Sequence, residues 1–121
     1  MQYETTVLVD SEVAPGVQFG IRRMSFGRRL ELTRQIRTLA ERVEFLAAGE
    51  TAKEKLDAAV LAAEIDRTYL LWGLTEVMGL ELDGAPATPE SLTERGPEDL
   101  CREALAVVKA ECGLSEDEVK N

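Results

Sequence analysis

Histidine is absent from the 121-residue chain, and only two cysteines and six aromatic residues are present. The absence of histidine excludes Ser-His-Asp and Cys-His nucleophile systems, histidine-containing zinc sites and the Glu-x-x-His di-iron motif. The longest uncharged stretch of the second half, residues 68–75, is far shorter than the ~18–20 apolar residues of a membrane span. The amino terminus also lacks the basic and apolar regions of a signal peptide. The composition therefore predicts a soluble cytoplasmic domain.

Motifs for bound cofactors and metals are missing as well. The chain has no phosphate-binding loop, and Gly16, Gly20 and Gly27 are too scattered for a dinucleotide fingerprint. Cys101 and Cys112 lie in one predicted helix, where their Cα atoms would be roughly 16 Å apart, too far for a disulfide. We therefore expect buried thiols, no cofactor, no metal and no enzymatic activity.

Residues 1–24 carry the signals of a β-hairpin. Two β-branched or alternating runs, residues 5–9 and 17–21, flank the turn signal Ala14-Pro15-Gly16. Residues 17, 19 and 21 share one face, which we expect to be buried. A lone hairpin is marginal in water, so this one must pack on other elements.

Two long helices are predicted next, over residues 25–49 and 50–79. Ser25 and Thr51 are their expected N-caps, the second with Glu54 in a capping box, and Gly49 is the stop of the first. The first helix carries an apolar seam with alternating spacings of four and three: Leu32, Ile36, Leu39, Val43 and Leu46.

The second helix is apolar on most of its circumference. One seam contains Leu56, Val60, Ala63, Leu70, Leu74 and Val77, and an adjacent seam contains Leu61, Ile65 and Trp72, with Tyr69 alongside. As a continuous helix to Met78 it would be about 42 Å long, against a diameter of roughly 35 Å for a compact chain of this size. Its apolar surface is covered either by the rest of the fold or partly by another chain.

The remaining chain is predicted to be an extended, turn-rich region over residues 80–96 and helices over residues 97–121. Residues 79–84 are compatible with a third strand, and Thr88 with Pro89 can begin a short helix. Residues 115–118 form a further capping box. The sequence therefore predicts a single α+β domain over residues 1–121, mainly α, with a small antiparallel hairpin packed on two long helices and a carboxy-terminal helix.

Charge is distributed unevenly along the chain, whose net charge is −9. Residues 22–42 contain seven arginines against two acidic residues, whereas seven basic and seventeen acidic residues follow from Gly49 onward. The arginines of the first helix can pair with the acidic second half or with another copy, bind an acidic or mixed-charge protein, or bind nucleic acid. We do not expect nucleic acid, because the whole domain is acidic and has no recognition or base-stacking motif.

The order of these pieces resembles a group of phage proteins. The resemblance rests on Phe19-Gly-Ile-Arg-Arg-Met-Ser25, an Arg/Glu-rich helix, Gly79-Leu-Glu-Leu-Asp-Gly84, Gly96-Pro-Glu-Asp-Leu100 and Leu114-Ser-Glu-Asp-Glu-Val-Lys-Asn121. Together they resemble the small tail assembly chaperones and tail-morphogenesis proteins of prophages and long-tailed phages. The family supplies no catalytic or ligand residues to carry over.

The resemblance implies a non-enzymatic tail assembly chaperone in the bacterial host cytoplasm. Its expected partners are a tape-measure-type protein, whose helical segments it would bind, and the tail-tube protein. The sequence also leaves open whether the chain forms a homo-oligomer. The alternatives are a structural tail or head–tail connector subunit and, with less support, an Arg-helix nucleic-acid-binding regulator. The candidate partner-binding residues are Leu61, Ile65, Tyr69, Trp72, Arg34 and Arg37.

Overall fold

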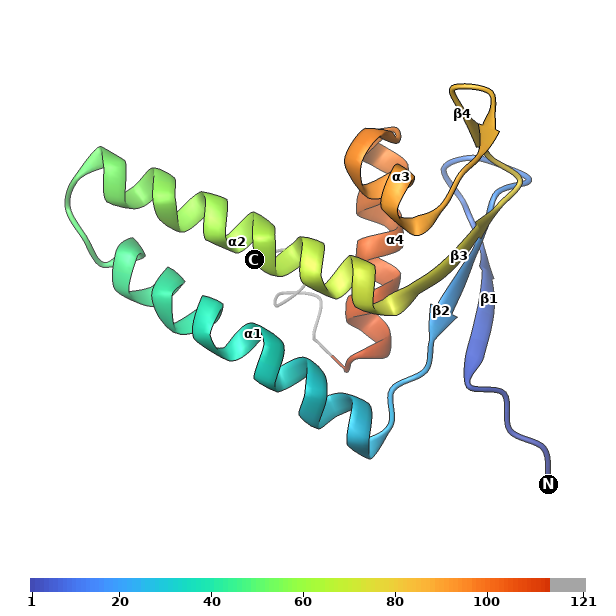
Figure 1. Cartoon of the computed structure of the whole chain (residues 1–121), viewed down its shortest axis with the longest axis horizontal. Helices are drawn as coiled ribbons and strands as arrows, with labels where there is room; N and C mark the ends of the chain where they lie inside the picture. The colour runs from blue at the N-terminus through green and yellow to red at the C-terminus, as the bar shows by residue number, and fades with distance from the viewer. Residues whose placement is uncertain (114–121) are drawn as a thin grey trace. The chain divides into compact units, whose positions relative to one another are not determined.

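The computed structural model describes residues 1–113, which form four helices, a three-stranded antiparallel sheet and a separate two-stranded sheet (Figure 1). The predicted class, α+β and mainly α, is confirmed. In chain order the elements are β1 (Thr6–Asp10), β2 (Gln18–Arg22), α1 (Phe26–Ala47), α2 (Ala52–Gly73), β3 (Leu74–Met78), β4 (Glu81–Leu82), β5 (Ala85–Pro86), α3 (Pro89–Arg95) and α4 (Glu98–Glu111). The predicted capping box at residues 115–118 lies outside the described residues.

The chain divides into two compact units. Unit 1 consists of Met1–Met24 and the chain from Tyr69 onward, and unit 2 consists of Ser25–Thr68. Unit 1 therefore holds the sheet with α3 and α4, while unit 2 holds α1 and most of α2.

The core of unit 1 lies on one face of the sheet β1-β2-β3. All neighbouring strands are antiparallel, with Phe19 opposite Val9 on one side and opposite Val77 on the other. Phe19 is fully buried and Ile21 is 1% exposed, so the predicted buried face of the hairpin is confirmed. From α4, Ala104 and Val108 complete this core, and neither side chain is exposed to solvent.

The second long helix is shorter than predicted, and the continuous helix to Met78 is wrong. It ends at Gly73, and Leu74–Met78 form β3, which pairs with β2 (Figure 1). A Cβ at Gly73 would clash with the side chain of Val108, so this helix end needs glycine. The prediction of a third strand in residues 79–84 is wrong: the third strand of the sheet is β3, and Glu81–Leu82 pairs with Ala85–Pro86 in a separate sheet.

Local capping signals are confirmed in both units. The side chain of Ser25 accepts a hydrogen bond from the backbone N–H of Arg28, and Thr51 Oγ1 accepts one from the backbone N–H of Glu54 at 3.1 Å. Thr88 caps α3 in a full capping box with Ser91. Each cap satisfies a backbone donor that the first helical turn leaves without a partner.

Unit 2 is a pair of antiparallel helices joined by a short turn (Figure 1). The predicted seam of α1 is its least exposed face: Leu32 is buried, and Ile36, Leu39, Val43 and Leu46 are half-buried. On α2, Ala58 and Leu61 are buried. Few large side chains are fully enclosed in this unit, in contrast to unit 1.

A carboxylate on α4 holds the β1–β2 turn of unit 1. Glu103 accepts a hydrogen bond from Ser11 Oγ at 2.5 Å and one from the backbone N–H of Glu12 at 2.7 Å. Ser11 Oγ in turn accepts from the backbone N–H of Ala14 at 2.9 Å. Hydrogen bonds to a charged acceptor contribute about 1.5–3 kcal/mol. Glu103 therefore couples the hairpin turn to the helix layer.

Replacing Glu103 with alanine should lower the free energy of unfolding by about 2 kcal/mol, because it leaves the buried Ser11 hydroxyl and the exposed backbone N–H of Glu12 without their acceptor. Chemical denaturation of the variant measures this. Glu98→Ala is the control on the same helix, since the ion pair of Glu98 with Arg102, at 2.8 Å, is exposed and worth ~0.5 kcal/mol. Equal losses in the two variants would contradict the role of Glu103.

Candidate functional site

The described part of the chain contains no cluster of side chains that could hold a metal ion. Among residues 1–113, no three histidine, cysteine, aspartate or glutamate side chains are placed to hold a metal ion together. In that same part of the chain, no helix combines the length and hydrophobicity required to cross a membrane. Two exposed surfaces of unit 2 carry apolar side chains in water.

The first such surface is an apolar stripe on α2. Leu56 is 67% exposed and Val60 is 58% exposed. The stripe, hereafter the α2 stripe, consists of the exposed residues Ala52, Leu56, Ala59, Val60 and Ala63. Their spacing of three and four residues places them on one face of the helix. An apolar helix face of this kind is the feature that amphipathic helices use to pack on one another.

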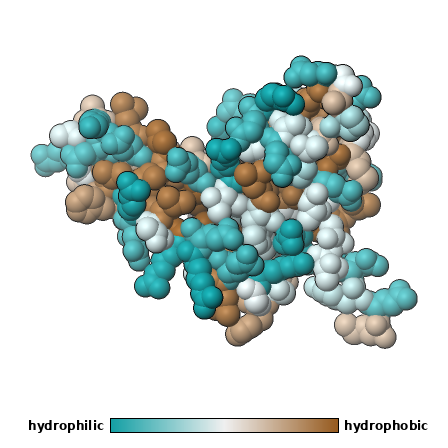
Figure 2. Space-filling model, in the orientation of Figure 1, coloured by the Kyte–Doolittle hydropathy of each residue, from teal (hydrophilic) through white to brown (hydrophobic). Residues whose placement is uncertain are grey.

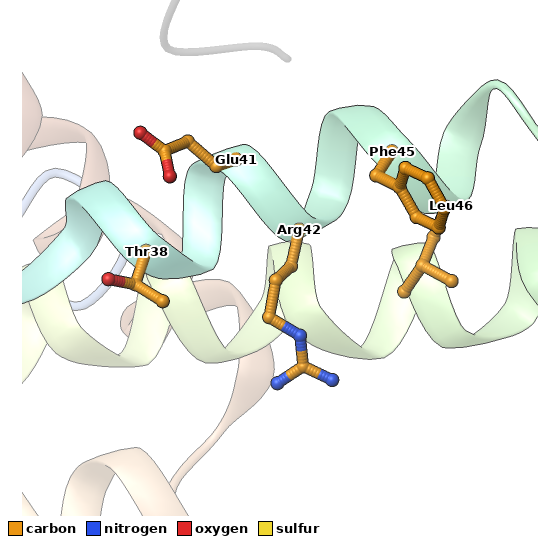
Figure 3. A pocket seen from close by; sticks show the side chains of 5 residues that line it. All are labelled: Thr38, Glu41, Arg42, Phe45 and Leu46. Carbon is orange, nitrogen blue, oxygen red and sulfur yellow. The ribbon is translucent and has the colours of Figure 1, made fainter.

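The second surface is a depression on α1, hereafter the α1 depression. Its volume is about 340 Å³, and it is lined by Thr38, Glu41, Arg42, Phe45 and Leu46. Figure 3 shows these side chains projecting from consecutive turns of the helix. Phe45 is 78% exposed, so a large aromatic ring stands in solvent next to charged groups. Such amphipathic anchors are typical of interaction sites.

The charges of unit 2 balance. Residues 25–68 contain eight basic and eight acidic residues, so the entire net charge of −9 belongs to unit 1. In Figure 2, hydrophobic side chains are exposed among hydrophilic ones over the α1–α2 hairpin. A neutral, partly apolar surface meets little long-range repulsion from a protein partner.

The arginines predicted to meet a partner are exposed on α1. Arg37 pairs with Glu41 of the same helix, with Nε and Oε1 3.3 Å apart and both side chains largely exposed. Arg34 and Arg42 make no ion pair within residues 1–113. The structure therefore leaves two guanidinium groups of this helix able to bind a carboxylate.

The four partner-binding candidates that the sequence predicts on the second helix are not part of the α2 stripe. Leu61 is buried, and Ile65, Tyr69 and Trp72 are half-buried. The Lys109 ammonium lies over the Tyr69 ring, 5.7 Å from the ring centroid. The backbone carbonyl of Trp72 accepts a hydrogen bond from Arg22 Nε at 2.9 Å. The structure thus gathers none of the four into an exposed patch.

The exposed apolar residues Leu56, Val60 and Phe45 were not among the predicted candidates. The first two belong to a seam that the sequence predicts on the second helix, but the sequence does not determine which of the two seams is enclosed. Phe45 is adjacent to Leu46 of the predicted α1 seam but is not part of that seam. Aromatic residues outside an apolar seam were the signal that could have identified it.

The two cysteines are thiols, Cys112 buried and Cys101 half-buried. Burial raises the pKa of the Cys101 thiol above its ordinary value of 9.0, an effect that Arg102 opposes and Glu98 reinforces. A raised pKa leaves less thiolate at neutral pH, so Cys101 is poorly suited to nucleophilic or redox chemistry.

Alkylation of Cys101 should reach half of its maximal rate at a higher pH in the folded protein than in the urea-unfolded protein, because folding disfavours the thiolate. Below pH 9.0 the Cys101 thiol is protonated in both states, so its titration does not change the free energy of unfolding. Above that pH the thiol ionises first in the unfolded chain, which lowers the free energy of unfolding. A pH series of iodoacetamide labelling measures the shift, and Cys101→Ser identifies the signal. Superimposable folded and unfolded profiles would contradict it.

Comparison of the chain with models of known protein families, with curated proteins and with solved structures finds no match. The resemblance to phage tail assembly chaperones stays a prediction.

Proposed function

We propose that this protein is a non-enzymatic assembly chaperone that binds an amphipathic helix of another protein along the α2 stripe. The observation that supports this most is the exposure of Leu56 and Val60 on a helix that is otherwise part of a folded hairpin. Burying such a side chain contributes about 1.5–3 kcal/mol. A fold that leaves several of them in water on one face provides the apolar strip for helix-in-groove docking.

The partner that fits is long, helical and poorly soluble by itself. The tape-measure-type protein implied by the resemblance has this character, and the tail-tube protein would join later in assembly. Binding through the neutral hairpin leaves unit 1, with six basic and fifteen acidic residues, outside the contact. Its negative charge would keep the complex dispersed in the cytoplasm of the bacterial host.

Co-expression with the tape-measure product of the same gene neighbourhood tests the proposal. The expected result is a larger soluble fraction of that product and co-elution of both chains in size-exclusion chromatography. Unchanged solubility without a complex would overturn the chaperone function. Rings or tubes formed by the pure protein in electron micrographs would instead favour a structural tail or connector subunit.

A further inference from the structure

Strand β1 is one edge of the three-stranded sheet, and within residues 1–113 no other strand pairs with its outer side (Figure 1). The Thr5 carbonyl accepts a backbone hydrogen bond at 2.9 Å from the residue after β2, and the Ser11 N–H donates one at 2.8 Å to the residue before β2. In an antiparallel pair, residues that bond to the neighbouring strand alternate with residues that do not. The odd-numbered residues of β1 therefore bond to β2, and Thr6, Leu8 and Asp10 direct their N–H and C=O groups outward.

The outer side of β1 lacks the usual protection of a sheet edge. Natural edge strands are kept from pairing by lysine, proline or a β-bulge. Thr6–Asp10 contains no lysine or proline, and its register with β2 is continuous. Leu8 at its centre is 53% exposed, and its partner on β2 is Gly20, which has no side chain to pack on. The strand therefore presents free backbone groups and an exposed leucine on the same edge.

We propose that β1 pairs antiparallel with β1 of a second copy of this chain, so that the two sheets become one continuous sheet. The two-fold axis passes between the two Leu8 residues and is perpendicular to the sheet. Such an axis keeps each face of the sheet on its own side, so Leu8 meets Leu8 of the other copy. The outward groups of Thr6, Leu8 and Asp10 then form about six backbone hydrogen bonds, two at each hydrogen-bonded pair.

This register gives every side chain of β1 a suitable neighbour. On the exposed face, Leu8 packs on its own copy, and the Thr6 hydroxyl donates to the Asp10 carboxylate of the other chain. On the core face, the half-buried Val7 lies beside the half-buried Val9 of the other copy, which extends the core across the interface. Because Val7-Leu8-Val9 reads the same in both directions, the strand has the self-complementarity that a two-fold interface requires.

Other pairings of two copies fit less well. A shift by two residues places Leu8 opposite Thr6 or Asp10, and a parallel pair brings the two Asp10 carboxylates side by side. In the proposed register these carboxylates are four residues apart along the strand, roughly 13 Å, which exceeds the ~8 Å screening length at physiological ionic strength. A strand of another protein would satisfy the backbone groups equally well, but the symmetric side-chain order of β1 favours a second copy.

Net charge determines the conditions under which the dimer forms. Unit 1 carries the entire net charge of −9, so two copies repel each other at long range. Salt screens this repulsion, and self-association should tighten as the salt concentration rises. A basic strand of another protein would instead be released by salt. Since β1 contributes no residue to the α2 stripe, the inference does not rest on the proposed function.

Sedimentation velocity of the pure protein tests this inference. We expect a wild-type dimer that depends on concentration and strengthens with salt. Leu8→Pro removes an N–H that points away from β2, a place where sheets tolerate proline, and should weaken self-association at least ~10-fold. Leu8→Lys keeps the N–H, places two ammonium groups together at the axis and should give the same loss. Leu56→Lys makes the same charge change on an exposed leucine of α2 and should leave association unchanged.

Circular dichroism verifies that the variants keep their fold. A wild-type protein that stays monomeric at every protein and salt concentration would overturn the proposal. So would Leu8→Pro and Leu8→Lys variants that keep their fold and dimerise like the wild type.

Cysteine cross-linking tests the register. In Leu8→Cys the two new thiols meet at the axis, where paired residues have Cα atoms about 5.5 Å apart, within the range of a disulfide. Thr6→Cys is the control, since its two copies are separated by roughly 13 Å along the strand. We expect oxidation to give disulfide dimers of Leu8→Cys and no more dimer of Thr6→Cys than of the wild type. Equal cross-linking of the two variants would overturn the register, and β1 amides that become protected only when another protein is added would assign the edge to that protein instead.

Discussion

Replacing Leu56 and Val60 together with glutamate is expected to lower the affinity for a co-expressed tape-measure segment at least about 100-fold. The change removes the two largest apolar side chains of the α2 stripe and introduces carboxylates that an apolar helix face cannot hydrogen-bond. Because both side chains are mostly in water in the folded chain, the variant should retain its helicity and its unfolding midpoint. Binding measured by isothermal titration, together with circular dichroism, separates the two effects.

Leu8→Glu, which adds one carboxylate where the double variant adds two, is the control for that variant. Leu8 is an exposed leucine, 53% accessible, but it lies on β1 in unit 1 rather than on the α2 stripe. The control should bind the tape-measure segment like the wild type. Equal loss of affinity in both proteins would mean that added negative charge, and not the α2 stripe, determines binding.

The largest loss of stability is expected from Gly79→Ala, about 3 kcal/mol. Gly79 follows β3 with a φ of +80°, a conformation that L-residues adopt only at a cost. A Cβ there would also clash with the carbonyl oxygen of Gly16 in the β1–β2 turn. Since that contact is with backbone, it cannot be relieved by a side-chain rotation. Thermal unfolding should show a Tm lower by roughly 10–20 °C.

Gly84→Ala separates the two causes. Gly84 has the same φ of +80°, but a Cβ there meets no atom within 4 Å. This variant should lose only the conformational part, about 1–2 kcal/mol. Should the two substitutions cost the same, the close approach of Gly79 to the hairpin turn would have no energetic role.

Local signals in the sequence were sufficient for helix starts and for the hairpin. Ser25, Thr51 and Thr88 each cap a helix through contacts within four residues, and the two-residue period of β2 identifies its buried face. These features depend on neighbours in the chain. They can therefore be predicted without knowing the tertiary fold.

The end of α2 could not be predicted in the same way. Leu70, Leu74 and Val77 fit a helical seam, yet Leu74 and Val77 are buried as residues of β3. What decides between the two is pairing with β2, more than fifty residues earlier in the chain. The tertiary contact thus overrides a pattern that helix and strand satisfy equally well.

The candidate site shows the same limit. The sequence predicts that α2 has two apolar seams, but which of the two is enclosed depends on tertiary packing that no local pattern encodes. The structure encloses Leu61 and exposes Leu56 and Val60. Likewise, the clamp formed by Glu103 on Ser11 joins residues about ninety positions apart, and no local signal marks it.

The separation of charge between the units gives the proposed function a physical basis. Unit 1 combines an enclosed core with all of the net negative charge, while unit 2 is neutral and exposes apolar side chains on two faces. A stable, charged body with a weakly enclosed hairpin is suited to holding another chain without precipitating.

The docking surface can be observed directly by methyl NMR of the protein mixed with the tape-measure segment. If the α2 stripe holds the partner helix, the methyl resonances of Leu56 and Val60 will shift strongly, while those of Leu92 and Val108 in the core of unit 1 will stay in place. Resonance shifts confined to unit 1, or unshifted Leu56 and Val60 resonances when a complex has formed, would contradict binding of the partner helix along the α2 stripe.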